Sequence, residues 1–543
     1  MVRRRTNRQR GRAVIIAELI QRSCRIHAEA TAIRRGEASL TYAQLGERSA
    51  RLANGLRSLG LEPGDRVATL GPNAPTSLEE MTGLAIGGYA RVALHPMNAG
   101  DAHAYMLANS GSRALITHVD LYERFATDFA SVPGLEHIIV HGGGPIDYER
   151  LLADASPDDP EVRVSGDDIL HLAYSSGTSG RPKASVHTHR SWMHVTADNA
   201  VMLPRITGED VYLAAAPLSH AASTVLYALL AQGASTVAMP SFDPAEALRL
   251  VERHRCSMTV MVPTMLHMLV SHPHVATRDL SSLRVLLYAG SPISTATARA
   301  AQLALGDVLF QSYGQSECLP ATSLTPEDHA RAVAGDDELL RSAGRACLNA
   351  SIRIVNEEDR ELGPGDSGEI LVHTEGRMRG IFGNPETTAE RITPDGFVRT
   401  GDVGHLDERG YLFVTDRKDD MIISGGFNIW PAEIEKALTA HPAVADAVVV
   451  GVPHPKWGQT PHAVVVLREG QKATADELIG FCRAAIGPMK KPTGVVFRDS
   501  PVPRNALGKL QRRVLRDEYW PSHGRPKPPD IQGPGGHLIT STP

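Results

Sequence analysis

Short apolar runs that end in turn residues recur through the first two thirds of the chain, and they constrain the fold more than any other feature. They read ARVALHP, SRALITH, HIIVHG, VYLAAAP, STVAMP, SMTVMVP and RVLLYAG. Turn residues or a helical pattern follow each run, which is typical of buried parallel strands that alternate with helices. At roughly 150 residues per domain, 543 residues provide about three or four such units. The expected fold class is therefore α/β, with a large N-terminal domain of layered α/β subdomains.

The pattern changes twice toward the C-terminus. Over residues 344–415, stretches such as SIRIVNEED, GEILVHT and GYLFVTD are separated by Gly, Pro, Asp and Asn, which predicts an antiparallel or β-barrel-like subdomain. A small, mobile α+β domain is expected after DRKDD, because Pro431 stands where a helix begins and AVVVGVP and AVVVLRE have the pattern of strands. Capping boxes at residues 41–44 and 474–477 predict two helix starts.

The chain ends and the cysteines indicate the surroundings of the protein. We predict a disordered basic arm over residues 1–19 and a disordered Pro- and Gly-rich tail over residues 521–543. A net charge of −5 indicates no nucleic-acid partner, and the apolar stretch AVIIAELI contains Glu18 and is too short to span a membrane. The five cysteines never form a C-x-x-C pair, so neither a disulfide framework nor a zinc site is expected. The predicted location is cytoplasmic.

The stretch YSSGTSGRPK, residues 174–183, has the chemistry of a phosphate-binding loop. Its glycines let backbone N–H groups approach an anion, its hydroxyls donate hydrogen bonds, and Lys183 adds a compact charge. Of the 56 lysines and arginines only nine are lysines, and no other lysine precedes residue 418, which favours a specific need for an ammonium group. The spacing is not that of the P-loop, because Pro182 and Ala184 flank the lysine. Taken alone, the stretch is also compatible with a flexible surface turn.

Further motifs place this stretch in a known context. They are YAGSPIS at residues 288–294, QSYGQSE at residues 311–317, RTGDVG at residues 399–404, DRKDD at residues 416–420 and PRNALGK at residues 503–509. In this order they resemble the adenylate-forming superfamily of acyl- and aryl-CoA synthetases, carrier-loading adenylation domains and beetle luciferases. The resemblance covers about residues 20 to 516. It departs from the family at Ala184, where glycine is usual, and at Ser316, where threonine is usual.

The resemblance implies how ATP is bound. Tyr313 packs on the adenine and Ser316 contacts the α-phosphate. Glu317 holds Mg²⁺, for which one carboxylate with phosphate oxygens and water is chemically sufficient. Asp402 accepts hydrogen bonds from both ribose hydroxyls, with Arg417 as its partner. The positions that the resemblance assigns to ATP and CoA are Ser175, Ser176, Gly177, Thr178, Ser179, Gly180, Lys183, Gly290, Ser291, Pro292, Tyr313, Gly314, Asp402, Arg417, Ser424, Gly425 and Gly426.

The implied reaction has two halves. The carboxylate of the acid attacks the α-phosphate of MgATP to give an acyl-adenylate and pyrophosphate, and Lys509 reaches both anions. A small domain over residues 421–520 then swings about Asp419, in the hinge of residues 417–420, relative to the N-terminal domain of residues 20–416. The swing withdraws Lys509 and presents residues 424–426 to the adenylate, whose acyl carbon is attacked by the thiol of CoA.

The acceptor and the acid are less constrained by the sequence. The stretch DDMIISGGFNIWPAEIE followed by VPHPKWGQ favours an acid-thiol ligase that uses CoA, and the alternative is a free-standing enzyme that loads a separate carrier protein. A non-catalytic nucleotide-binding regulator is disfavoured, because the lysines, acids and arginine of the motifs are intact. The acid pocket is expected near PLSHAAS, residues 217–223, where His220 either borders the substrate carboxylate or packs in the core. The small residues that follow it, 221–223, predict an aromatic or branched acid.

Overall fold

The computed structural model describes residues 14–175, 181–291, 293–424, 427–454, 456–488, 490–504, 510–519 and 538–539. Its contacts divide the chain into two compact units: unit 1 comprises residues 1–352 and 371–400, and unit 2 comprises residues 353–370 and 401–543. The predicted boundary at residues 417–420 stays a prediction. Across the described ranges, no helix is long and apolar enough to cross a membrane.

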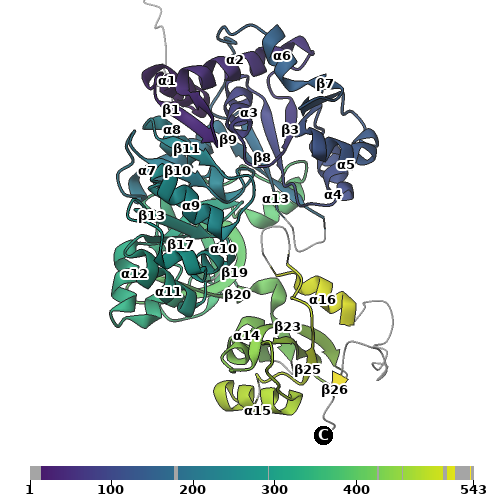
Figure 1. The fold of residues 1–543 in the computed structure, drawn as a ribbon. Helices are drawn as coiled ribbons and strands as arrows, with labels where there is room; N and C mark the ends of the chain where they lie inside the picture. Colours follow the sequence, from purple (N-terminus) through teal and green to yellow (C-terminus); the bar gives the residue numbers. More distant parts are fainter. Residues whose placement is uncertain are drawn as a thin grey trace, which may run out of the picture. The chain divides into compact units, whose positions relative to one another are not determined.

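One sheet of unit 1 carries the base of the glycine-rich loop (Figure 1). Its order is β7 (Ile146–Asp147), β6 (His137–His141), β5 (Ala114–His118), β3 (Arg66–Leu70), β4 (Ala90–Leu94), β8 (Ile169–Ser175) and β9 (Lys183–Thr188). The strands from β7 to β8 are parallel, and β9 runs antiparallel to β8. The apolar runs at β4, β5 and β6 therefore form the parallel strands that the sequence predicts.

Helices cover both faces of this first sheet. The first face packs against α2 (Tyr42–Ser58), α3 (Pro75–Ile86) and α6 (Tyr148–Asp154), through Leu52, Leu78 and Leu151 of the main core. The second face packs against α4 (Gly100–Ser110) and α5 (Val119–Ala130) in a separate core. The predicted capping box at residues 41–44 is confirmed at the start of α2, because each of Thr41 and Gln44 binds the other's backbone N–H.

The second sheet of unit 1 is also mainly parallel. Its order is β16 (Arg345–Ala346), β15 (Cys318–Leu324), β14 (Leu309–Gln315), β13 (Val285–Ala289), β12 (Met258–Met261), β10 (Val211–Ala214), β11 (Ser235–Ala238), β1 (Thr31–Arg35) and β2 (Ala38–Thr41). The pairs from β14 through β1 are parallel, and the strands at either end are antiparallel to their neighbours.

Helices also accompany the second sheet, in the alternation that the apolar runs predict. They are α1 (Ile16–Ile26), α7 (His189–Met202), α8 (Leu226–Ala231), α9 (Pro244–His254), α10 (Pro263–Val270), α11 (Thr295–Leu305) and α12 (Pro326–Val333), with the 3₁₀ turns η1 (Ala221–Ser223), η2 (Pro273–Ala276) and η3 (Asp337–Arg341). Helix α13 (Pro385–Arg391) instead follows Ile381, which bridges to Ser185 of β9 in the first sheet. Most of the buried side chains of this layer belong to the main core.

The later part of the chain forms two smaller sheets. The stretch expected to be antiparallel or barrel-like gives the order β17 (Ala350–Val355), β18 (Gly368–Thr374), β19 (Val398–Leu406) and β20 (Leu412–Arg417), followed by the turn η4 (Lys418–Asp420). The last sheet has the order β22 (Phe427–Ile429), β21 (Ile422–Ser424), β24 (Gly458–Leu467), β25 (Gly494–Phe497) and β26 (Leu538–Ile539), with β23 (Val444–His454) beside β24. Its helices are α14 (Pro431–Thr439), α15 (Ala475–Ile486) and α16 (Arg512–Tyr519). Pro431 and the capping box at residues 474–477 start α14 and α15 as predicted.

Each of the two chain ends that we predict to be disordered contains residues that the structure places in a helix or strand. The arm predicted over residues 1–19 is too long, because α1 begins at Ile16 and buries Leu19 and Ile20 in the main core. The burial of these apolar side chains stabilises α1, although the residues that precede the helix are basic. In the tail predicted over residues 521–543, residues 538–539 form strand β26 against β25, and the rest lies outside the described residues.

Candidate active site

The glycine-rich stretch is anchored at its base by two strands. Ser175, at the end of β8, pairs directly with Lys183, at the start of β9. The lysine is half-buried. Ser176, Gly177, Thr178, Ser179 and Gly180 lie outside the described residues. A fixed base means that Lys183 extends from a strand rather than from a free loop.

Ser316 and Glu317 form a tight turn between β14 and β15. Gly314 precedes this turn, and a Cβ there would lie 2.9 Å from the carbonyl oxygen of Cys318. Only glycine fits so close to the opposite strand. Tyr313, one residue earlier, is half-buried and pairs with Thr322 of β15. The β14–β15 pair therefore fixes the positions of Tyr313, Ser316 and Glu317 relative to one another.

His187 connects this turn to the strand that carries Lys183. Its Nε2 lies 2.7 Å from the carbonyl oxygen of Ser316, although the two residues are 129 positions apart. Burial lowers the pKa of His187 to about 4, so the neutral ring donates its N–H to that carbonyl. On the other side of the turn, the Met378 N–H donates to the Glu317 carbonyl at 2.9 Å. Strand β9, which begins with Lys183, and the Ser316–Glu317 turn are thus fixed to each other.

The sequence contains no signal for this role of His187. The contact partner is a backbone carbonyl in another sheet, and no local spacing reveals such a partner.

The YAGSPIS stretch lies at the end of β13, beside β14. Gly290 has φ +92°, a conformation that favours glycine, and a Cβ at this position would be 3.9 Å from Val262. Tyr288 fixes the strand, because its hydroxyl bonds Gln311 at 3.1 Å and His329 at 2.8 Å. Ser291 is described and Pro292 lies outside the described residues. Because β13 and β14 are parallel, Gly290 and Tyr313 lie at the same edge of the sheet.

A buried asparagine holds the predicted acid-binding stretch. The amide of Asn73 donates to the carbonyls of Ala214 and Ala216 at 2.9 and 2.8 Å, and its oxygen accepts from the Leu218 N–H at 2.8 Å. All three bonds end on the segment that leads to His220. Asn73 is therefore a positioning residue that the sequence analysis missed.

His220 is half-buried beside another histidine. Its ring centroid is 5.1 Å from that of His95, and its Nδ1 is 2.8 Å from the hydroxyl of Ser219. Burial, and then the neighbouring His95, lower the pKa of His220 to about 3. Near neutral pH it is an uncharged imidazole. The three small residues after it form η1, where Ala222 and Ser223 are buried.

In unit 2, Asp402 and Arg417 face each other across two strands. They are direct partners in the β19–β20 pair, and Nε of Arg417 lies 2.7 Å from the Asp402 carboxylate. The aspartate side chain is 7% exposed. Lys418 follows and pairs with Glu369 at 2.9 Å. The backbone of Asp419, the predicted hinge, lies in η4 directly after these two anchored residues.

The remaining motif residues of unit 2 are only partly described. Ser424 ends β21 and pairs with Gly458. Gly425, Gly426 and Lys509 lie outside the described residues. Residues 504 and 510, which border the PRNALGK loop, form a β-bridge, so the loop that bears Lys509 is closed at its base.

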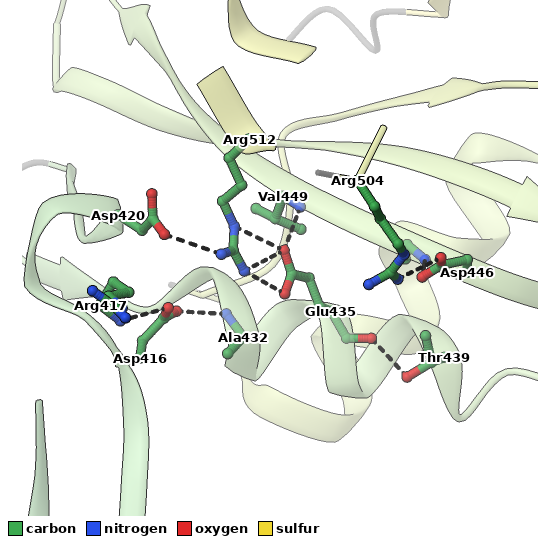
Figure 2. A network of polar contacts seen from close by, with 11 residues as sticks. Asp416, Arg417, Asp420, Ala432, Glu435, Thr439, Asp446, Val449, Arg504 and Arg512 are labelled. Atoms are coloured by element: carbon green, nitrogen blue, oxygen red, sulfur yellow. Dashed lines mark hydrogen bonds and ion pairs between the residues drawn. The ribbon is translucent and has the colours of Figure 1, made fainter. Parts of the chain in front are cut away.

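An ion-pair network surrounds this loop base (Figure 2). Arg512 contacts Glu435 of α14 at 2.6 and 2.8 Å and Asp420 at 3.0 Å. Asp416 accepts the Ala432 N–H at 2.8 Å, and Arg504 pairs with Asp446 at 3.0 Å. Arg512 therefore ties the chain just after the Lys509 loop to α14 and to the residue that follows Asp419.

Glu317 has the donor set that a magnesium ion accepts. The side chain is half-buried at the turn, and within the described part of the chain no arginine or lysine pairs with it. An unpaired carboxylate beside a hydroxyl residue fits Mg²⁺, which binds one or two carboxylates plus phosphate oxygens and waters.

Known proteins share both the sequence motifs and the architecture. Residues 20–382 match the model of the AMP-binding enzymes, and residues 433–509 match that of the AMP-binding enzyme C-terminal domain. A feruloyl-CoA synthase of Amycolatopsis sp is 36% identical over 92% of this chain and 98% of its own length. The fatty acid–[acyl-carrier-protein] ligase ScoC of Streptomyces coeruleorubidus is 34% identical over 90% of this chain and 93% of its own.

A solved structure has the same fold. The amide bond synthetase McbA from Marinactinospora thermotolerans superposes with a TM-score of 0.83 and 30% identity, covering 93% of this chain and 100% of its own. The mixed α/β class and the separate C-terminal domain that the sequence predicts are thereby confirmed.

Proposed function

The chain belongs to the AMP-binding enzymes, and from this premise we propose how it activates an acid and which residues carry the reaction. It is an AMP-forming acid-thiol ligase. ATP and a carboxylic acid give an acyl-adenylate and pyrophosphate. The acyl group then passes to CoA, which gives an acyl-CoA thioester and AMP.

The contact between His187 and Ser316 carries the assignment of the first half-reaction. It joins the strand that begins with Lys183 to the turn that bears Ser316 and Glu317. Phosphoryl transfer depends on positioning and charge neutralisation rather than on a protein nucleophile, so a fixed spacing between these groups is what the reaction requires. Lys183 is proposed to bind the departing pyrophosphate and Ser316 the α-phosphate.

Adenylation brings two anions together. A carboxylate oxygen of the acid attacks the α-phosphorus, and the bond to the pyrophosphate oxygen breaks. Lys509 is proposed to contact both the carboxylate and the α-phosphate, which offsets their repulsion and aligns them. Glu317 is proposed to hold Mg²⁺, which when bound neutralises phosphate charge.

The second half-reaction is assigned to unit 2. Asp402 is proposed to accept the ribose hydroxyls with Arg417 beside it, and the 2.7 Å pair between them orients the carboxylate. The backbone change is proposed at Asp419, because residues 417 and 418 are anchored before it and Asp420 is anchored after it. Residues 424–426 are proposed to line the path of the pantetheine arm, whose thiol attacks the acyl carbon as AMP leaves.

We propose that the acid activated in this reaction is aromatic or branched. Small residues follow His220 in η1, and no charged side chain of PLSHAAS offers a partner for an α-amino group. A relative that is 36% identical is named feruloyl-CoA synthase, and the feruloyl group is aromatic, which supports this choice. A neutral His220 is suited to hydrogen-bond the substrate carboxylate without holding it as an ion pair.

A separate carrier protein is the second candidate acceptor. The observation that favours it is the 34% identity to an acyl-carrier-protein ligase over most of both chains. A cytoplasmic location is proposed from the sequence alone, and the five cysteines are free and buried in the structure.

The test is pyrophosphate release from MgATP across aryl, short-, medium- and long-chain acids, with and without CoA. Turnover that requires CoA, with a thioester detected by mass spectrometry, is expected for aryl acids. Release that CoA does not accelerate, with the adenylate retained, points to the carrier protein. A strict preference for acetate or propionate contradicts the proposed acid class.

A further inference from the structure

Two histidines end neighbouring strands of the first sheet of unit 1, away from the motifs of the active site. His118 is the last residue of β5 and His141 the last residue of β6, and the two are direct partners in this parallel pair. Because partners in register point to the same face, their rings lie together, with centroids 4.6 Å apart. The face is the one covered by α3, since Ile116 and Ile139, two residues earlier, belong to the core that contains Leu78 of α3.

Helix α3 adds a carboxylate to the two imidazoles. Oε1 of Glu80 lies 2.9 Å from Nε2 of His141, and the Glu80 side chain is only 8% exposed. One ligand atom from each of Glu80, His118 and His141 lies within 4.8 Å of the others. Three elements that are separate in the sequence thus bring two nitrogens and one oxygen to a single point.

The charges around this point leave Glu80 available to a cation. Its neighbour Glu79 is already neutralised by Arg48 at 2.9 Å and accepts the Tyr148 hydroxyl at 3.0 Å. Within the described ranges, no arginine or lysine forms an ion pair with Glu80. Arg91 interacts with Glu80 electrostatically without forming an ion pair, and its Nε donates to the Thr69 hydroxyl at 3.1 Å.

The place in the sheet is one where α/β proteins bind ligands. After β3 the chain adds β4 on one side, and after β4 it returns to add β5 on the other side of β3. The carboxyl ends of β3 and β5 therefore border a topological switch point, where the following loops diverge and leave a crevice. Gly71, just after β3, forms the floor: a Cβ there would lie 2.6 Å from Cδ2 of His118.

We propose that Glu80, His118 and His141 bind one divalent transition-metal ion, with Zn²⁺ as the committed species. Two imidazoles and a carboxylate suit this class of ion, and water completes the coordination. The ion would connect α3 to the ends of β5 and β6. It would thus stabilise the position of α3, the helix that follows Asn73. The site is independent of the adenylation residues.

The experiment uses the full chain, stripped with a chelator and then titrated with Zn²⁺ against a chromophoric competitor. Co²⁺ provides a visible spectrum of the same site. The variants are Glu80→Gln and His118→Gln. Because His118 is half-exposed at the end of a strand, the second variant keeps the test usable if the first one misfolds. His272→Gln is the matched control, because His272 also lies beside another histidine, His274, with ring centroids 4.8 Å apart.

We expect one equivalent of Zn²⁺ in the wild-type chain and a rise in its melting temperature when the ion is added. Each site variant should lose at least about tenfold in affinity, since even partners outside the first coordination shell contribute 10- to 100-fold. The control should match the wild type. Equal affinity in the wild type, both site variants and the control overturns the proposal, and so does a wild-type chain that binds no Zn²⁺ at micromolar concentration.

Discussion

Replacing Arg512 by methionine tests whether the network in Figure 2 holds the C-terminal part of unit 2 together. The Arg512 side chain is 17% exposed and its partner Glu435 is 13% exposed, so both charges are largely removed from water. Removing one partner of a buried ion pair leaves an uncompensated charge and costs about 3–5 kcal/mol. The loss is therefore expected to be about 3–5 kcal/mol in the free energy of unfolding.

A double variant distinguishes two contributions to the destabilisation: the loss of the ion pair, and the cost of leaving the Glu435 carboxylate buried without a partner. Glu435 also accepts the Val449 N–H at 2.8 Å, and glutamine preserves that acceptor while removing the charge. Arg512→Met with Glu435→Gln should therefore recover at least about 1 kcal/mol of the single variant's loss. The matched control is Arg504→Met, whose pair with Asp446 has both side chains about one third exposed and should cost about 0–1 kcal/mol.

The pH dependence of the single variant has a definite sign. Burial already raises the pKa of Glu435, although Arg512 opposes the shift. Without the arginine, the folded chain retains a proton that the unfolded chain releases above about pH 4.3. The destabilisation should therefore shrink as the pH falls from 7 toward 4.

Amide hydrogen exchange in β23 and β24 of the full chain is the assay, because it reports the opening of these two strands separately from the unfolding of the rest of the chain. Protection of those strands should fall in Arg512→Met and much less in Arg504→Met. Equal protection in the two variants, or no recovery in the double variant, refutes the reasoning from burial.

Two further predictions concern catalysis and pH. Lys509→Ala should slow adenylation roughly 10²-fold or more, by analogy with the loss of a preorganised transition-state donor, and spare thioester formation from a supplied acyl-adenylate; an equal loss in both half-reactions, measured by rapid quench, contradicts the domain swing. His187, whose folded pKa is about 4 against about 6.5 unfolded, should cost the chain up to about 3 kcal/mol as the pH falls from 6.5 to 4, because only the unfolded chain takes up the proton. His187→Gln should reduce the slope of stability against pH over that window in thermal unfolding, and an unchanged slope contradicts the assignment.

Local patterns in the sequence sufficed wherever one turn of helix or one strand decides the outcome. The capping boxes at residues 41–44 and 474–477 need only partners three residues apart, and Pro431 needs only its own fixed φ to start α14. The parallel strands followed from apolar runs of the right length. The motifs that carry Lys183, Glu317 and Asp402 could also be recognised, because the proposed binding of phosphate, metal and diol specifies the residue types.

The contacts that fix these motifs were not predictable from the sequence. His187 reaches a carbonyl in another sheet, Asn73 holds a segment about 140 residues away, and Arg512 pairs with Glu435 across 77 positions. No sequence pattern marks such pairs, because each side chain has many possible partners until the strands take their register and the helices pack.

The sequence alone determined the family, the reaction and the residue types that a nucleotide requires, since those depend on local spacing and chemistry. The tertiary structure decided which parts of the chain meet: His118 lies beside His141 beneath α3, the Ser316–Glu317 turn lies against β9, and the predicted hinge residue Asp419 lies between anchored neighbours. Proximity of this kind depends on sheet order and core packing, which are properties of the whole folded chain rather than of any one segment.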